Sequence, residues 1–288
     1  MQSFTLNSID QALLGLALQE DLGIPYTDIT TQTLFDQNNP PYSTKIISKE
    51  QQPVRVCGLP ILYALCEKME LPFTFNALKK DGDILEPRET LLMLEGHPYL
   101  LLTLERTLLN FLRHLSAIAT LTKQVTDRVK NTPLKILDTR KTTPGLRHLE
   151  KYAVHCGGGV NHRMGLFDAY MIKDTHIDLI GGLEKALERI PNKNQNDLPV
   201  IVEIRNLNEL DVALRYGQEK IHRVLLDNMS INTMKQAVLR CENIFETEAS
   251  GNITLENITA IAETGVQYAS IGMLTYGAGQ VDLSMVEG

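Results

Sequence analysis

The stretch LDTRKTTPGLRHLEKYAVHCGGGVNHRMGLFDAYMIKDTHIDLIGG, residues 137–182, mixes cations, glycines and short apolar runs. From Asp138 to His176, six arginines and lysines outnumber four acidic residues, although the chain of 288 residues has a formal net charge of −7. Four of the seven histidines and the glycine run 157–159 lie in the same stretch. Because Arg and Lys match the oxygens of carboxylates and phosphates, this composition predicts a pocket for a small molecule with several negative charges, in preference to a solvated loop.

Two apolar runs in this stretch end in charged residues, and similar runs recur along the rest of the chain. The six runs cover residues 134–140, 170–176, 200–206, 223–229, 243–250 and 268–274. Helical or loop segments separate them, which is typical of βα units and a parallel sheet. Since no run is followed by G-x-G-x-x-G, we predict an α/β barrel and not a doubly wound sheet. Six strands in place of eight predict an incomplete barrel.

The first hundred residues predict a smaller domain of mixed helices and strands. Residues 8–22 predict a helix that begins at Ser8 and has Ile9, Leu13 and Leu16 on one face. Two strands are predicted within 44–59, a helix at 59–69, and a hairpin at 79–96. Leucines at helical spacing predict the longest helix at 98–130, with a break near Ser116.

Composition limits the possible partners. The negative net charge argues against nucleic acid, because binding to its phosphates requires a basic face. The amino-terminal residues do not resemble a signal peptide, and no apolar run reaches the roughly 18–20 residues of a membrane span. The cysteines show no C-x-x-C pair, which predicts reduced thiols in a cytoplasmic protein; they are Cys57, Cys66, Cys156 and Cys241.

The carboxyl ends of barrel strands carry the chemistry in this kind of fold, so they define the candidate site. Glu203 and Asp227 end two successive runs, and paired hard carboxylates can hold Mg²⁺ directly or through water. Ser250-Gly251-Asn252 precede a helix predicted at 253–265, whose first backbone N–H groups can bind a phosphate. Together these residues predict a site for an anionic ring and a Mg²⁺-bound phosphorylated sugar. The other residues selected are Asp138, Thr139, Arg140, Lys141, Lys173, Asp174, Glu248, Ser270 and Gly272.

Longer motifs in the chain resemble those of the quinolinate phosphoribosyltransferases, also called carboxylating nicotinate-nucleotide diphosphorylases. The resemblance covers nearly the whole chain, and three positions depart from the usual family pattern, namely His155, Thr175 and Tyr276. The matching residues are Glu20-Asp21, 28–31, Glu105-Arg106-Thr107, Asn110, 114–116, 138–147, 150–154, 157–159, Asn161-His162-Arg163 and Ile172-Lys173-Asp174.

The resemblance implies an N-terminal α/β sandwich at residues 1–115, rejoined by 275–288, and an incomplete α/β barrel at 116–274. It also implies a cytoplasmic homodimer or higher oligomer that acts in NAD biosynthesis. The implied reaction joins quinolinate to phosphoribosyl pyrophosphate with Mg²⁺ as cofactor, and gives nicotinate mononucleotide, pyrophosphate and CO₂.

The family pattern also implies roles for individual residues. Arg106 would enter the site of the neighbouring subunit, and Lys141 and Lys173 are the candidates for protonating the ring after CO₂ leaves. Glu203 and Asp227 would lie on the side of the ribose and the metal, and Ser250, Gly251 and Gly272 would hold the 5′-phosphate. The cations that would line the site are Arg106, Arg140, Lys141, His162, Arg163 and Lys173.

Three other functions remain open from the sequence. A molybdenum-transport-associated paralogue of the same fold would act on another pyridine-like or anionic substrate, but the intact Asn161-His162-Arg163 motif argues against it. A Schiff-base aldolase would use Lys173, although that lysine lies among many other cations. A non-enzymatic anion sensor is the third alternative.

Overall fold

The computed structural model describes residues 4–36, 38–191 and 198–288, and within them the chain divides into two compact units. The first unit comprises Met1–Lys123, Thr142–Gly158 and Thr275–Gly288, and the second comprises Gln124–Lys141 and Gly159–Leu274. The units therefore divide after Lys123 and not at 115/116, and segment 142–158, which was predicted in the barrel, belongs to the first unit. Its helix α5 (Arg147–Cys156) is held there by polar contacts, among them the Tyr152 hydroxyl, which donates to Asp81 over 2.8 Å.

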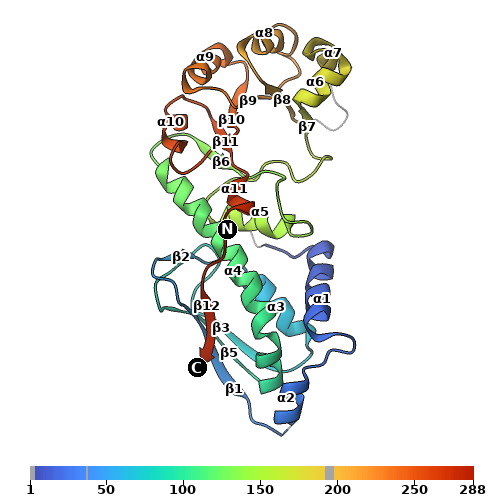
Figure 1. Ribbon diagram of the computed structural model, residues 1–288, viewed down its shortest axis with the longest axis vertical. Coiled ribbons are helices and arrows are strands. Elements are labelled where there is room, and N and C mark those ends of the chain that lie inside the picture. Colours follow the sequence, from blue (N-terminus) through green and yellow to red (C-terminus); the bar gives the residue numbers. More distant parts are fainter. Residues whose placement is uncertain (1–3, 37, 192–197) are drawn as a thin grey trace. The chain divides into compact units, whose positions relative to one another are not determined.

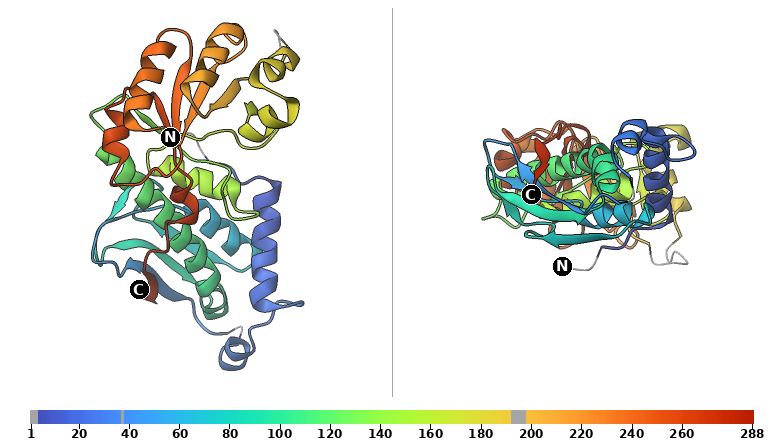
Figure 2. Two further views of the ribbon diagram at one scale, coloured as in Figure 1. Left: turned by 45° about the horizontal axis from the view of Figure 1, so that its top comes forward. Right: turned by 90° about the horizontal axis from the view of Figure 1, so that it is seen from below.

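The first unit is built on an antiparallel sheet of β1 (Tyr42–Ser48), β3 (Phe73–Ala77), β5 (Thr90–Gly96) and β12 (Leu283–Glu287), in the order β12-β1-β5-β3. The carboxyl-terminal strand β12 thus joins the same sheet as β1. Helices α3 (Leu59–Lys68) and α4 (Pro98–Arg128) lie over one face of this sheet (Figure 1, Figure 2). Two further helices are α1 (Ser8–Leu22) and α2 (Ile29–Leu34).

The predicted hairpin at 79–96 is wrong. Strand β4 (Ile84–Leu85) pairs with β2 (Val54–Arg55) in a small separate sheet, whereas β5 pairs with β1 and β3. Residues 80–83 nevertheless form a turn, in which Asp83 N donates to Lys80 O over 3.0 Å and Gly82 has a φ of +90°. Partner choice differs from the prediction because β3, a strand that the sequence analysis did not identify, takes the position beside β5.

The long helix α4 is continuous through Ser116, where a break was predicted. The Ser116 hydroxyl accepts from Cys57 N over 3.1 Å and is 3.2 Å from Cys57 O, so it bonds to the neighbouring segment and does not disturb its own helix. Helix α1 also differs from expectation, since Asn7 is its N-cap and Ile9 and Leu16 are exposed. Among the described residues, no helix combines the length and apolarity needed to cross a membrane.

The described residues of the second unit form a parallel sheet whose strands correspond to the six predicted runs. Its order is β6-β11-β10-β9-β8-β7, with β6 and β7 at the two edges, so the barrel is open as predicted. Helices α6 to α9 lie outside the curve of the strands (Figure 1). The strands are β6 (Lys135–Leu137), β7 (Tyr170–Ile172), β8 (Val200–Ile204), β9 (Arg223–Asp227), β10 (Glu246–Ser250) and β11 (Tyr268–Ser270). The helices are α6 (Asp174–Ile180), α7 (Leu183–Arg189), α8 (Leu207–Tyr216), α9 (Ile231–Cys241) and α10 (Ile258–Ala262), and α11 (Met273–Tyr276) begins in the second unit and ends in the first.

Candidate active site

The register of the parallel sheet places several predicted site residues on one face. Asp227 of β9 pairs with Ser250 of β10, and Glu203 of β8 pairs with Leu225 of β9. Because side chains alternate between the two faces of a strand, Glu203, Asp227 and Ser250 share one face, which we call the inner face. Ser270 of β11 is on the same face, since Ala249 pairs with Ala269.

Two arginines form a positively charged part of the site. Arg140 follows β6, and its buried Nε atom has no hydrogen-bond partner among the described residues. Arg163 donates from Nη1 to Ala169 O over 3.0 Å. Burial and the nearby Arg140 lower the pKa of Arg163, and Asp168 only partly offsets them. Two guanidinium groups that repel each other in a partly buried place suit an anion with paired oxygen atoms.

Three carboxylates form a negatively charged part of the site. Burial raises the pKa of Glu203, and the charges of Asp227 and Asp174 raise it further, whereas Lys173 and Arg205 act in the opposite direction. The structure therefore brings together Glu203 and Asp227, the two predicted metal ligands. Their hard oxygen atoms are the kind of ligand that Mg²⁺ prefers.

A tight turn holds Asp227 at the end of β9. The Asn228 side chain donates to Asp227 Oδ2 over 2.8 Å, and its Oδ1 accepts from Asn252 Nδ2 over 3.1 Å. Gly251 has a φ of +94°, and a Cβ atom there would overlap the Asn228 amide group. A glycine at 251 therefore allows Asn228 to link the β9 and β10 loops.

The helix predicted at 253–265 begins only at Ile258, so Ser250-Gly251-Asn252 do not stand at a helix N-terminus. The side chain of Asn257 donates to Asn252 O over 2.9 Å and accepts from Thr254 N over 2.8 Å, which fixes a loop before the helix. Any phosphate contact at 250–252 must therefore come from the turn itself.

The remaining predicted residues lie in different places. Lys141 is exposed, and its N–H donates to Thr139 Oγ1 over 3.0 Å. Lys173 is the N-cap of α6 and Gly272 lies between β11 and α11. Ser270 is buried on the inner face, and its hydroxyl donates to Ala249 O of the neighbouring strand over 3.4 Å. Arg106 is exposed on α4, in the first unit.

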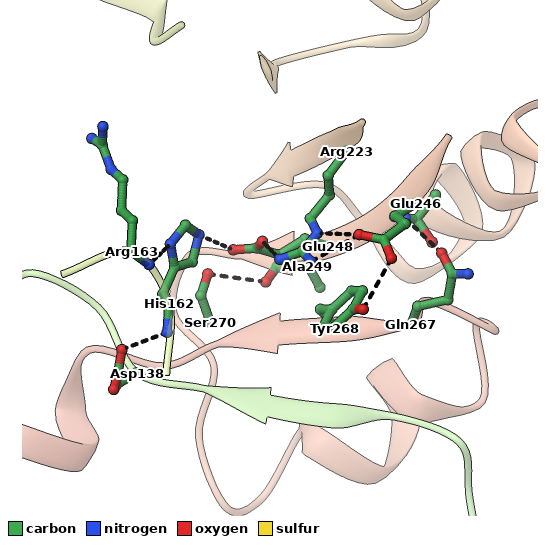
Figure 3. A network of polar contacts seen from close by, with 11 residues as sticks. Asp138, His162, Arg163, Arg223, Glu246, Glu248, Ala249, Gln267, Tyr268 and Ser270 are labelled. Carbon is green, nitrogen blue, oxygen red and sulfur yellow. Dashed lines mark hydrogen bonds and ion pairs between the residues drawn. The ribbon is translucent and has the colours of Figure 1, made fainter. Parts of the chain in front are cut away.

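A polar network on the inner face adds Arg223 and Glu246, which the sequence analysis did not single out, to the predicted residues Glu248 and His162. Arg223 bonds to Glu246 and Glu248, and Glu248 also faces His162, as Figure 3 shows. Its sequence signal was the alternation Glu246-Thr-Glu248-Ala-Ser250, because a parallel strand covered on both faces is usually apolar throughout.

Comparisons with known proteins agree with this architecture. Residues 28–116 match the family described as "Quinolinate phosphoribosyl transferase, N-terminal domain", and residues 118–286 match its C-terminal domain. The chain is 38% identical over 274 residues to a probable carboxylating nicotinate-nucleotide pyrophosphorylase of Bacillus subtilis, covering 95% of this chain and 91% of that protein.

Two further similarities cover most of the chain. It is 36% identical over 288 residues to the decarboxylating quinolinate phosphoribosyltransferase 2 of Nicotiana glauca, covering 95% of this chain and 80% of the relative. The solved nicotinate-nucleotide pyrophosphorylase of Francisella tularensis superposes with a TM-score of 0.90 at 36% identity, over 98% of this chain and 97% of that one. The chain therefore belongs to the quinolinate phosphoribosyltransferase family.

Proposed function

We propose that this chain transfers the phosphoribosyl group of phosphoribosyl pyrophosphate to quinolinate and releases pyrophosphate and CO₂, a step of NAD biosynthesis. The observation that carries the proposal is the division of the strand ends into a cationic part at Arg140 and Arg163 and an acidic part at Glu203 and Asp227. The names of the relatives support the same reaction.

The cationic part suits quinolinate, which carries two adjacent carboxylates. Arg140 and Arg163 would bind these carboxylates and relieve their own repulsion, and Lys141, His162 and Lys173 would complete the set. Orientation of the ring nitrogen toward C1′ of the ribose then supplies much of the rate acceleration. After transfer, the ring carries a positive charge that accepts the electron pair left when the 2-carboxylate departs as CO₂. A proton from Lys141 or Lys173 replaces the carboxyl group.

The acidic part suits the ribose and a divalent cation. Glu203 and Asp227 would hold Mg²⁺, directly or through water, since three nearby carboxylates need a positive charge to balance them. A bound ion would neutralise the negative charge that develops on the departing pyrophosphate. The turn at Ser250, Gly251 and Asn252, together with Gly272, would accept the 5′-phosphate through backbone N–H groups.

A direct assay tests this function. The protein is mixed with quinolinate and phosphoribosyl pyrophosphate, and pyrophosphate and nicotinate mononucleotide are measured; omission of quinolinate is the control. Equal amounts of pyrophosphate and nucleotide are expected. Pyrophosphate release that does not depend on quinolinate, or no release, would exclude the reaction.

The proposal includes a homodimer in which Arg106 acts in the site of the other subunit. Its support is that Arg106 is exposed on α4 of the first unit, whereas the strand ends belong to the second. A cation supplied by another subunit would help to exclude water from the site.

Mixing inactive variants tests the shared site. Arg106→Ala and Lys141→Ala are combined after partial dissociation, and each mixed dimer is expected to regain one intact site. The matched control combines Arg140→Ala with Lys141→Ala, two changes in the same unit, which should restore nothing. Heterodimers of the first pair that stay inactive would place Arg106 in its own chain's site.

We also propose that the enzyme acts in the cytoplasm. The support is that Cys57, Cys66, Cys156 and Cys241 are all free and buried, as expected in a reducing compartment. Cell fractionation followed by detection of the protein tests this location.

A further inference from the structure

Glu248 is a fully buried carboxylate between two charged or polar partners on the inner face. Its Oε2 accepts from Arg223 Nη1 over 3.1 Å, and its Oε1 lies 3.3 Å from His162 Nε2. Burial alone raises the pKa of Glu248, but His162, Arg223 and the Ser270 hydroxyl together bring it below the ordinary value for a glutamate. Glu248 is therefore an ionised group in the interior of the second unit.

Arg223 does not depend on Glu248 alone. Its Nε and Nη2 atoms both bond to Glu246 Oε2, over 3.0 and 2.8 Å, and its guanidinium lies 3.6 Å from the ring centre of Tyr268. Tyr268 in turn donates its hydroxyl to Glu246 over 3.0 Å. Glu246, which lies on the same strand as Glu248, thus already gives Arg223 a partner charge. Pairing with Arg223 therefore does not by itself explain a second carboxylate, buried at position 248.

The His162 side of the network has a defined orientation. The backbone N–H of His162 donates to Asp138 Oδ1 over 2.9 Å. The ring atom Nδ1 of His162 accepts from the backbone N–H of Arg163 over 2.7 Å. With Nδ1 acting as an acceptor, the ring hydrogen lies on Nε2, the atom that faces Glu248. The imidazole therefore connects the buried carboxylate to the backbone of Arg163.

We propose that Glu248 is a positioning residue that fixes the orientation of the His162 ring and, through it, the backbone of Arg163 at the substrate site. This inference rests on the proposed function, in which His162 and Arg163 bind the carboxylates of quinolinate. Burial of an ionised group is unfavourable unless the group has partners, and the contact with His162 supplies a functional reason for the buried charge. Glu248 does not touch substrate in this scheme; it acts through His162.

The test replaces Glu248 with glutamine, which keeps the shape and removes the charge. The KM for quinolinate is expected to rise about tenfold, the low end of the range for losing a polar contact with a charged group, because the charge that faces the His162 ring at 3.3 Å is removed. The KM for phosphoribosyl pyrophosphate should stay the same. Glu246→Gln is the matched control, because it also removes a carboxylate partner of Arg223, whereas the carboxylate 3.3 Å from His162 Nε2 belongs to Glu248. The control should leave the KM for quinolinate unchanged.

A double-mutant cycle separates positioning from a general structural effect. If Glu248 acts through His162, Glu248→Gln changes the KM little in a His162→Asn background. Equal effects of Glu248→Gln with and without His162 would overturn the inference, as would an unchanged KM in the single variant. If His162→Asn itself leaves the KM for quinolinate unchanged, the assignment of His162 under the proposed function fails instead.

Two further measurements keep the test decisive if Glu248→Gln folds poorly. Glu248→Asp retains the charge but withdraws the oxygens by one methylene, so a smaller rise in the KM for quinolinate is expected, and no rise refutes the inference. Nitrogen NMR of the His162 ring should show the hydrogen on Nε2 in the native protein. A ring with its hydrogen on Nδ1 would contradict the geometry on which the inference rests.

Discussion

Replacement of Gly251 by alanine tests how the turn after β10 supports Asp227. Gly251 has a φ of +94°, a conformation that costs an L-residue about 1–2 kcal/mol. The new Cβ atom would also overlap the Asn228 amide, so Asn228 must move away from Asp227 Oδ2 and Asn252 Nδ2. Loss of these two hydrogen bonds adds about 1 kcal/mol for each bond.

Gly265→Ala is the matched control. Gly265 has a similar φ of +86°, but a Cβ atom there would meet Val238 Cγ1 at 3.5 Å, an ordinary contact. Both variants should lose about 1–2 kcal/mol of unfolding free energy from strain, and thermal unfolding measures that loss. The Gly251 variant should lose about 2 kcal/mol more, from the two broken hydrogen bonds.

Steady-state kinetics give the functional result. Because Asp227 lies on the acidic part of the site, Gly251→Ala should raise the KM for phosphoribosyl pyrophosphate and leave the KM for quinolinate close to its native value. Gly265→Ala should change neither constant. Equal kinetics and equal unfolding temperatures in the two variants would refute the argument, since strain would then be the whole effect.

Three other predictions concern the substrate, the metal and pH. Quinolinate should be used at least about a hundredfold better than nicotinate in kcat/KM, the lower bound for two lost charge-assisted hydrogen bonds; comparable rates would show that the second carboxylate is not recognised. Asp227→Asn should fold normally but raise the Mg²⁺ concentration for half-maximal activity about 10–100-fold, and unchanged kinetics would assign Asp227 a structural role. Burial raises the pKa of Glu150, but His114 at 2.9 Å and Thr143 lower it below its ordinary value. The stability that Glu150 supplies is therefore present above the ordinary glutamate pKa and is lost as the pH falls through the lowered one, so Glu150→Gln should flatten the acid side of the unfolding curve; an acid side as steep as that of the native protein would contradict this.

The sequence by itself determined the strands of the parallel sheet and which strand ends carry the candidate site residues. Each strand is a local apolar run that ends in polar residues, so its existence depends on neighbouring residues in the chain. The strand ends at Glu203 and Asp227 followed from the same pattern, and the register then placed both on one face. The family motifs identified Arg140 and Arg163, because these residues occur within continuous matching segments.

The sequence predicted less well where an element depends on a distant partner. Leucine spacing gave the whole of α4, but the break at Ser116 did not occur because Cys57 satisfies the hydroxyl. The apolar pattern of α1 selected the wrong face. The face that is buried carries Asp10, whose carboxylate lies 2.6 Å from His148, a residue 138 positions along the chain. Partners this distant leave no periodic signal.

Only the tertiary structure decided the assignment of segment 142–158 and the network around Glu248. Helix α5 belongs to the first unit because Tyr152 bonds to Asp81 there, a contact between residues 71 positions apart. Glu248 was visible in the sequence as a polar residue in a strand, but its partners His162 and Arg223 come from a loop and from another strand. Alternation along a strand specifies which face a side chain occupies, whereas the register between strands decides which charges meet, and that register is a property of the folded sheet.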